Sequence, residues 1–529
     1  MTAAAKFKVF PNLYKDSVTL MQLGAKLRAQ EGVAEASCIM ATPANLEQLR
    51  DADLAIDIAV APSDLLVVVR GEPDACDEAI AAAGTMLQSS ASASGGDAQA
   101  FQLPLTSIAL GLTRAQDADL ALISVPGDYA AAEAMKALAQ GLNVMLFSDN
   151  VTVADERAIK TFAREQNLFV MGPDCGTAIV NGIPLGFANV VRRGDIGLVA
   201  ASGTGLQEVT CRIHHAGGGV SQALGTGGRD LKEAIGGITM LQGLAALAGD
   251  PATRVIVLIS KPPAAAIARK ILDAAASAGK PVVVHFLGAT PDAVRGERLF
   301  AAESLQHAGD VAVALAQGKA APKSAGTPTS GQLAAIEDAA KRMAPSQCAV
   351  RGLFTGGTFC YEAQLAFRAR NLACRSNAPA DGVEPLDGKM EGHVFIDMGD
   401  DDYTRGRPHP MIDPSLRNAA VRTHSADPAT AAILFDVVLG YGSHPDPAGG
   451  LAEALTVAQS EAKAQGRTLA LIGHVCGTDG DPQDRAAQIR TLEGAGALIA
   501  ESNYQAATLA ATLAGDLASR MKQDRKRNP

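Results

Sequence analysis

Short, fully apolar runs alternate with amphipathic stretches along most of this chain. The runs ADLALIS, NVMLF and LFVM follow one another from residue 118, and segments of helical periodicity separate them. The same alternation returns after residue 194 and again after residue 349. Fully apolar strands between amphipathic helices are typical of a parallel sheet that is covered on both faces. The pattern therefore predicts a multi-domain α/β protein with doubly wound parallel sheets.

Two stretches without apolar periodicity divide the chain. SSASASGGDA (89–98) and GKAAPKSAGTPTSG (318–331) concentrate Gly, Ser, Thr and Pro, which is typical of linkers. Before the first stretch, helices and strands alternate on a smaller scale, which predicts a small, ACT-like α/β domain. The expected divisions are 1–98 for this small domain, 99–193 and 194–317 for two α/β domains, 318–345 for a linker with a leading helix, and 346–529 for a third α/β domain.

The composition narrows the class of function. Aromatic residues make up 4% of the chain, tryptophan is absent, and the net charge is −10. Both properties argue against nucleic acid as a partner, because few rings can stack on bases and the charge repels phosphates. No apolar stretch approaches the roughly 20 residues of a membrane span. The eight cysteines have no CxxC or zinc-type spacing, so we expect reduced thiols, no metal site and a cytoplasmic location.

Glycine-rich turns follow several of the predicted strands. In open parallel sheets ligands bind beyond the carboxyl ends of the strands, and a turn that opens a helix presents free N–H groups to an anion. The turn at Ser202 opens a helix directly, and Arg229 in a later turn offers a planar cation for a phosphate or carboxylate. The candidate anion-binding residues are Ser202, Gly203, Thr204, Gly205, Gly227, Gly228, Arg229, Gly356, Gly357 and Thr358. Asp174 and Cys175, in the turn GPDCG, are further cleft candidates.

The densest group of polar residues lies in the third domain, within FIDMGDDDYTRGRPHPM (395–411). Arg405 and Arg407 are suited to clamp an oxyanion, and His409 is suited to exchange a proton near neutral pH. We therefore predict these three residues as catalytic. Asp400 and Asp401, which can orient the arginines, and His474, which follows another apolar strand, are predicted to line the same cleft.

Three motifs carry a resemblance to a known family. GPDCG, GDIGLVAASGTGLQE and the turn GTGGRD resemble, in order, motifs of the succinyl-CoA synthetase alpha subunit, over residues 118–316. The resemblance implies a Rossmann-like CoA-binding domain at 99–193, followed by a flavodoxin-like domain. Two features depart from it: Lys261 stands where that family has a glutamate, and His307 lies later than the phosphohistidine. His285, inside an apolar strand, is interpreted as buried structure.

Taken whole, the chain resembles the FdrA family of acyl-CoA-synthetase-like proteins, whose last domain resembles the ligase domain of the succinyl-CoA synthetase beta subunit. The small first domain, the two synthetase-like domains, the linker and DMGDDDYTRGRPHPMID carry this resemblance. It implies a component of an oxamate carbamoyltransferase in allantoin degradation, which converts oxalurate and phosphate into oxamate and carbamoyl phosphate. It also implies companion subunits, self-association and CoA as a possible cofactor.

Two other functions remain open at the level of sequence. One is a subunit of an acyl-CoA ligase that borrows its nucleotide-binding part from another subunit. The other is a non-catalytic scaffold that binds CoA or a nucleotide. Carbamoyl transfer requires a phosphate pocket, cations for the carboxylate and a group that manages a proton, but it requires no phosphohistidine. It is therefore the function that we expect.

Overall fold

A computed structural model describes residues 5–527, except 52–53, 55–57, 59, 93–104, 295 and 405–406. The chain divides into two compact units. Unit 1 comprises Met1–Val170 and Asp401–Asp413, and unit 2 comprises Met171–Asp400 and Pro414–Pro529. Within the described residues, no helix combines the length and the hydropathy of a membrane-spanning segment.

Unit 1 begins with a small antiparallel sheet of order β1-β3-β2, against which α1 and α3 pack. Leu65–Val69 of β3 are fully buried, because this strand lies in the middle of the sheet. Sequence patterning anticipated all of these elements except β1, whose alternating Lys residues interrupt its apolar character. The elements are β1 (Ala5–Phe10), α1 (Ser17–Arg28), β2 (Val33–Met40), α2 (Pro43–Asp51), β3 (Leu65–Gly71) and α3 (Pro73–Ser92).

A second, three-stranded sheet of order β4-β5-β6 follows in unit 1. Its core includes Ala130, Ala134 and Ala137, whose small side chains let α5 lie close to the strands. The expected linker at 89–98 begins inside α3, and its remainder lies outside the described residues. The elements are α4 (Ile108–Leu112), β4 (Leu120–Ile123), α5 (Gly127–Ala139), β5 (Asn143–Leu146), α6 (Val153–Glu165) and β6 (Val170–Met171), and the late segment adds α13 (Asp401–Thr404).

The first half of unit 2 is a seven-stranded sheet of order β13-β12-β11-β9-β10-β7-β8. The strands from β13 to β10 are parallel, as expected, and the hairpin β7-β8 extends the sheet in antiparallel fashion. The strands are β7 (Thr177–Val180), β8 (Ile183–Gly186), β9 (Arg193–Ala201), β10 (Val220–Gly225), β11 (Val255–Ser260), β12 (Val282–Phe286) and β13 (Leu299–Ala301). The helices are α7 (Gly203–His215), α8 (Ile238–Gly249), α9 (Ala265–Ala276) and α10 (Leu305–Ala316).

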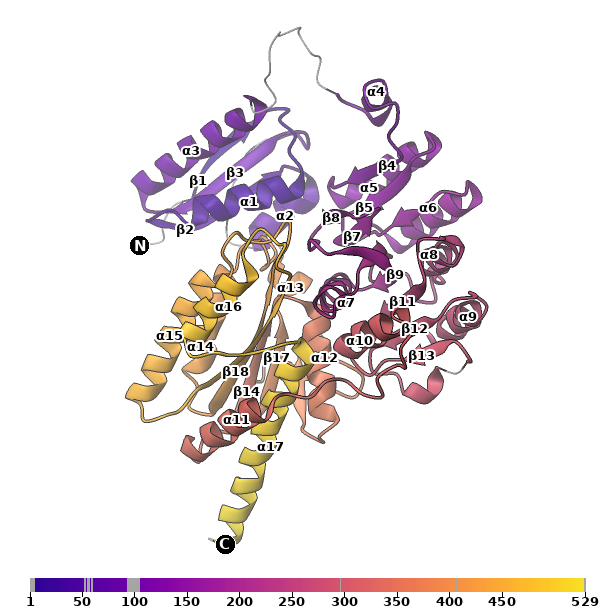
Figure 1. Cartoon of the computed structure of the whole chain (residues 1–529). Helices are drawn as coiled ribbons and strands as arrows, with labels where there is room; N and C mark the ends of the chain where they lie inside the picture. The colour runs from indigo at the N-terminus through magenta and orange to yellow at the C-terminus, as the bar shows by residue number, and fades with distance from the viewer. Residues whose placement is uncertain are drawn as a thin grey trace. The chain divides into compact units, whose positions relative to one another are not determined.

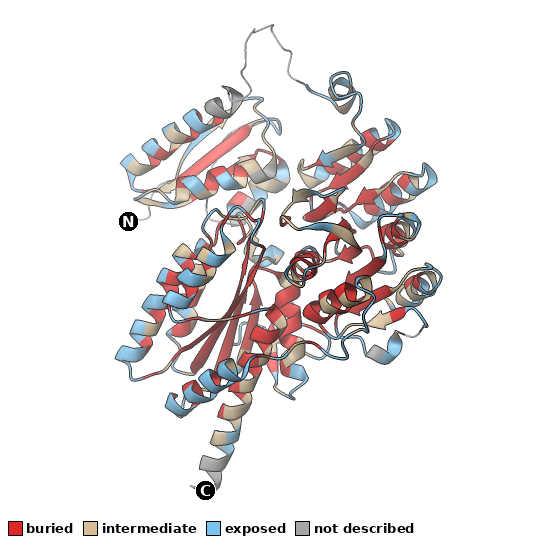
Figure 2. Cartoon of the chain, in the orientation of Figure 1, coloured by how far each residue is buried: buried red, intermediate tan, exposed pale blue. Residues whose placement is uncertain are grey.

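The second half of unit 2 is a parallel sheet of order β16-β15-β17-β14-β18-β19-β20. Its strands are β14 (Ala349–Phe354), β15 (Cys374–Ser376), β16 (Glu384–Pro385), β17 (His393–Asp397), β18 (Thr430–Val438), β19 (Ala470–Cys476) and β20 (Leu498–Ala500). Its helices are α11 (Ser330–Arg342), α12 (Gly357–Arg368), α14 (Ser415–Ser425), α15 (Gly449–Ala464), α16 (Arg485–Gly494) and α17 (Asn503–Arg527). Figure 2 shows that the central strands of this sheet are buried, whereas α15 exposes one side.

A layer of helices joins the two halves of unit 2. α7 packs against α10 and α12, and α17 packs against α10, α12 and β19 (Figure 1). The starts of α7 and α12 therefore lie at the carboxyl ends of strands from two different sheets. The predicted α/β class with parallel sheets is confirmed.

Candidate functional site

The starts of α7 and α12 meet within unit 2. Ser202 is the N-cap of α7, where its hydroxyl accepts a hydrogen bond from the N–H of Gly205 at 3.0 Å. The same hydroxyl lies 2.5 Å from the hydroxyl of Thr358 in the first turn of α12. The structure therefore brings together two of the turns that the sequence predicted as anion sites. Each helix start carries partial positive charge from its free N–H groups.

Two glycines make this close meeting possible. A Cβ on Gly357 would lie 2.4 Å from Oδ2 of Asp397, and a Cβ on Gly356 would lie 2.9 Å from Cγ2 of Thr204. Neither position therefore has room for a side chain. Because these glycines have no side chains, the start of α12 can pack closely against Asp397 and Thr204.

Two buried carboxylates stand at the same strand ends. Asp436 in β18 accepts hydrogen bonds from the N–H groups of Thr355 and Gly356, at 2.7 and 2.9 Å, and from the Thr355 hydroxyl. The N–H of Gly356, predicted to face an anion, thus donates to Asp436. An added anion is consequently better placed at the start of α7 than at the start of α12.

Asp397, the last residue of β17, is 6% exposed and accepts from the N–H of Gly399 at 3.0 Å. Burial raises its pKa to about 6, although the nearby charge of Lys261 opposes the shift. Lys261 follows β11, and its ammonium lies 6.0 Å from the centre of the Tyr361 ring. A carboxyl group of this pKa can hold or release a proton near neutral pH. Nothing in the sequence indicates that Asp397 and Lys261 lie close to each other.

The other two glycine-rich turns pack against each other. A Cβ on Gly227 would lie 2.1 Å from the carbonyl oxygen of Pro173, and one on Gly225 would lie 2.5 Å from Sγ of Cys175. Cys175 is buried, whereas Asp174 and Gly228 are exposed. Arg229 is half-buried in the same turn. Close packing therefore accounts for Gly227, which was predicted to bind an anion, and for the neighbouring Gly225.

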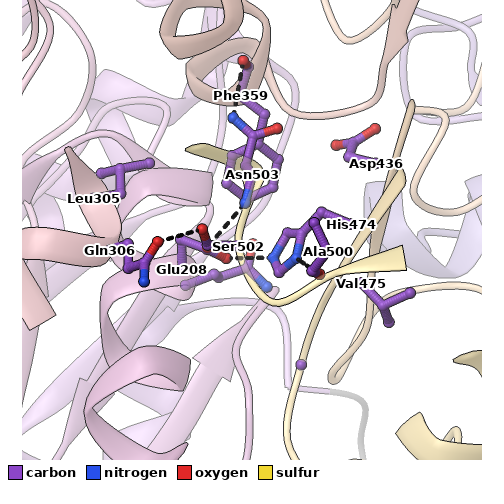
Figure 3. A network of polar contacts seen from close by, with 12 residues as sticks. Glu208, Leu305, Gln306, Phe359, Asp436, His474, Val475, Ala500, Ser502 and Asn503 are labelled. Atoms are coloured by element: carbon purple, nitrogen blue, oxygen red, sulfur yellow. Dashed lines mark hydrogen bonds and ion pairs between the residues drawn. The ribbon is translucent and has the colours of Figure 1, made fainter. Parts of the chain in front are cut away.

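His474 lies in a buried polar network rather than at an open strand end. Its Nε2 is 2.8 Å from Oε2 of Glu208 in α7, and its Nδ1 is 3.2 Å from the carbonyl oxygen of Ala500 (Figure 3). Both residues are at most 3% exposed. Burial alone would lower the pKa of His474, but the carboxylate of Glu208 outweighs it and raises the pKa to about 10. Only the structure shows that Glu208 is its partner.

Glu362 in α12 extends this network. Its carboxylate accepts from the N–H of Leu305 at 2.9 Å and from the side-chain amide of Asn503 at 2.8 Å. Burial raises the pKa of Glu362 to about 7. The network therefore links α7, α10, α12 and α17 through polar groups that are removed from water (Figure 3).

The predicted catalytic loop belongs mostly to unit 1. Arg405 lies outside the described residues, and the guanidinium of Arg407 is 3.6 Å from Oε1 of Glu35. Nδ1 of His409 accepts from the N–H of Met411 at 3.2 Å, and burial lowers the pKa of His409 to about 4. Asp401 also belongs to unit 1, whereas Asp400 belongs to unit 2. Because the loop and Ser202 lie in different units, the shared cleft stays a prediction.

Two other histidines are buried. His307 lies in the first turn of α10. Its Nδ1 accepts from the N–H of Glu303 at 3.2 Å, and its Nε2 lies 3.0 Å from the carbonyl oxygen of Pro322. His285 lies inside β12 and is 3% exposed, so its interpretation as buried structure is confirmed.

Three family models match the chain. One described as "AllF, heavy metal-associated domain" covers residues 1–102, one described as "CoA binding domain" covers 191–288, and one described as "CoA-ligase" covers 353–513. The ACT-like assignment of the first domain is not confirmed. The CoA-binding match falls on the segment expected to be flavodoxin-like, so a CoA-binding type for 99–193 stays a prediction.

Curated relatives agree with these matches. YahF of Escherichia coli K12 is 42% identical over 511 residues, which cover 96% of this chain and 98% of YahF. The alpha subunit of the ADP-forming succinate–CoA ligase of Methanothermobacter thermautotrophicus is 28% identical over 153 residues, 28% of this chain and 51% of that subunit. The chain thus spans about half the length of that subunit. ATP citrate lyase of Methanothrix soehngenii aligns with 79% of this chain at 14% identity, with a TM-score of 0.35.

The parallel sheets and the two CoA-related family matches define a fold of the CoA-binding and CoA-ligase type, like that of the succinyl-CoA synthetases. Its similarity to YahF runs from end to end, and its first domain matches the AllF model. The chain belongs to the FdrA-like family.

Proposed function

We propose that this protein is the FdrA-like subunit of an oxamate carbamoyltransferase, and that the phosphate end of its substrate binds at the start of α7. The observation that carries this proposal is the meeting of α7 and α12 through Ser202 and Thr358. The start of α7 at the carboxyl end of β9 supplies positive potential beside Thr358, whereas the start of α12 already faces Asp397 and Asp436. The AllF description of the first domain supports the link to allantoin degradation.

The chemistry consists of one exchange. A phosphate oxygen attacks the carbamoyl carbon of oxalurate, the bond from that carbon to the internal nitrogen breaks, and oxamate leaves. The proton of monohydrogen phosphate ends on the nitrogen of oxamate, so the reaction needs a group that passes this proton. Our candidate in unit 2 for the group that passes this proton is Asp397, which has a pKa of about 6 and lies beside the start of α12. Arg405, Arg407 and His409 remain candidates for holding the oxalurate carboxylate and for proton transfer.

A CoA ligase remains the second candidate, because the family models that match are of the CoA-binding and CoA-ligase types. A ligase of this kind transfers phosphate through a histidine. Both ring nitrogens of His307 lie at hydrogen-bonding distance from the backbone, and the residue is 2% exposed. A buried histidine with both ring nitrogens engaged is poorly placed to carry phosphate. The geometry therefore favours carbamoyl transfer over a ligase that works through His307.

The test is an assay of the chain together with its companion subunits. We expect carbamoyl phosphate from oxalurate and phosphate without ATP or CoA. Formation of an acyl-CoA that requires ATP, with labelled phosphate on the protein, would establish the ligase instead. An unchanged rate after substitution of Asp397, Arg405, Arg407 and His409 would assign a scaffold role to this chain.

Ser202→Ala tests the position of the phosphate, with Ser304→Ala as its matched control. Both serines are N-caps in unit 2, and Ser304 caps α10 by accepting from the N–H of His307. Loss of the cap should cost both variants about 1 kcal/mol of stability. Only Ser202→Ala should raise the KM for phosphate, by roughly tenfold, because one hydrogen bond to a charged group is lost or misplaced. Equal KM values in the two variants would exclude the start of α7 as the phosphate site.

A further inference from the structure

Beside the buried pair of Glu208 and His474 lie two cysteine thiols. The thiol of Cys476 faces Glu208 and His474, and it interacts with the thiol of Cys211. Ligand atoms of Glu208, His474 and Cys476 all lie within 4.8 Å of one another. All four residues are at most 3% exposed. The function proposed above uses none of these side chains.

Helix and strand periodicity explain why these side chains converge. Glu208 and Cys211 are three residues apart in α7, so they lie on one face of the helix. His474 and Cys476 are two residues apart in β19, so they lie on one face of the strand. α7 packs against β19, and these two faces meet. The result is an oxygen, a nitrogen and a sulfur donor within 4.8 Å of one another in unit 2, and the Cys211 thiol lies beside Cys476 as a fourth donor.

We propose that Glu208, His474, Cys476 and Cys211 form a buried site for a divalent cation of the zinc class. Thiolate and imidazole ligands favour zinc over magnesium or calcium, and a carboxylate completes a common donor set. The surroundings of His474 fit this role, because its Nδ1 lies 3.2 Å from the Ala500 carbonyl oxygen and its Nε2 faces Glu208 (Figure 3). A metal-bound histidine usually donates its second ring N–H to such an acceptor.

The ligands of the proposed site must lose protons before they can bind a cation. Burial raises the pKa of the Cys211 thiol, and the hydrogen bond with Cys211 together with burial raises that of Cys476. Without metal, both thiols and the His474 ring therefore hold protons. Binding of the cation releases these three protons to solvent, and two thiolates, one carboxylate and a neutral ring face the metal. Arg212 and Arg485 line the adjacent pocket and offset the remaining negative charge.

Such a cation would attach α7 to the sheet of the other half of unit 2. Glu208 lies six residues after Ser202, which is about 9 Å along the helix at 1.5 Å per residue. The metal would thereby hold the helix whose start faces Thr358. Its binding does not depend on carbamoyl transfer, so failure of the proposed enzymatic function would leave this proposal intact.

The experiment measures metal on the full chain. The protein is reduced, stripped with a chelator, incubated with Zn²⁺ and separated from free metal. We expect about one Zn²⁺ per chain, and Co²⁺ in its place should give a thiolate-to-cobalt charge-transfer band. Cys476→Ser should reduce that band, because only Cys211 then supplies a thiolate, and should weaken Zn²⁺ binding by more than about 100-fold.

Cys360→Ser is the matched control, since Cys360 is also fully buried in unit 2 but bonds with Ser376 and Gln364 instead. It should bind Zn²⁺ as the wild type does. Glu208→Gln, which keeps the shape of the side chain, should weaken Zn²⁺ binding about 10- to 100-fold and serves if Cys476→Ser does not fold. A reduced wild-type chain that takes up no Zn²⁺, or equal binding by the Cys476 and Cys360 variants, would overturn the proposal.

Discussion

At the start of α12, Gly357 faces a carboxylate at a distance that no side chain permits. A Cβ there would lie 2.4 Å from Oδ2 of Asp397, whereas a Cβ on Gly331, near the start of α11, would meet no atom within 4 Å. Gly357→Ala should therefore lower the free energy of unfolding by about 1–3 kcal/mol, because Asp397 must move. Gly331→Ala should leave it unchanged or raise it slightly. Urea unfolding of both variants measures the difference, and equal midpoints would contradict the close packing.

Asp397 also gives the stability a dependence on pH. Its pKa of about 6 in the folded protein is higher than the roughly 3.9 of an unfolded aspartate, so the folded state binds the proton more tightly. Stability should therefore fall as the pH rises from about 4 through about 6, by up to about 3 kcal/mol from this group. Asp397→Asn should remove that part of the decline. Chemical unfolding at a series of pH values tests this, and equal slopes for wild type and variant would show that Asp397 does not titrate there.

Sequence reasoning reached the residues of the α7 and α12 turns because a helix start after an apolar strand is a local pattern. It did not find Asp397 and Asp436 as site residues, although both stand at or near the ends of apolar strands. It predicted no metal site, because 265 positions separate Cys211 from Cys476 in the sequence. Donors brought together by a helix and a distant strand have no characteristic spacing. Only the tertiary fold makes them neighbours.

Among the elements, β14 shows how a strand adapts to its neighbours. A Cβ on Gly352 would lie 2.3 Å from the ring of Phe395 in β17 and 2.7 Å from the ring of Phe354. Gly352→Ala should therefore destabilise the protein by about 1–3 kcal/mol. Gly515→Ala in α17, where nothing lies within 4 Å, should instead stabilise it by up to about 1 kcal/mol. Thermal unfolding of the two variants should show shifts of opposite sign, and a shared sign would refute the packing argument.

The long apolar strands were predictable because they are buried on both faces, and their runs are continuous. β18 is the clearest case, since all nine of its residues are buried. The hairpin β7-β8, the edge strands β13 and β16, and β15 beside β16 were not predicted. Each is at most four residues long, and most of them contain exposed or half-buried positions. Such segments carry too little pattern to stand out from loops.

At the scale of the whole molecule, residues 401–413 leave unit 2 and complete unit 1. Arg28 at the end of α1 forms an ion pair with Asp413, and it donates to the carbonyl oxygen of Ala36 at 3.0 Å. Arg28→Ala should therefore loosen this segment. Hydrogen exchange should become about tenfold faster at residues 407–413, because a hydrogen bond to a charged group is lost, and should stay unchanged in β14. Unchanged exchange at 407–413 would show that other contacts hold the segment.

The late completion of unit 1 has a consequence for the nascent chain. Arg28 and Asp413 are separated by 385 positions. At about 5–20 residues per second, the ribosome needs roughly 20–80 s to make the stretch between them. During this time Arg28 lacks Asp413 as a partner and has only its contacts with Glu35 and Ala36, while β7 to β17 emerge. The order of synthesis thus leaves unit 1 incomplete until residues 401–413 have been made.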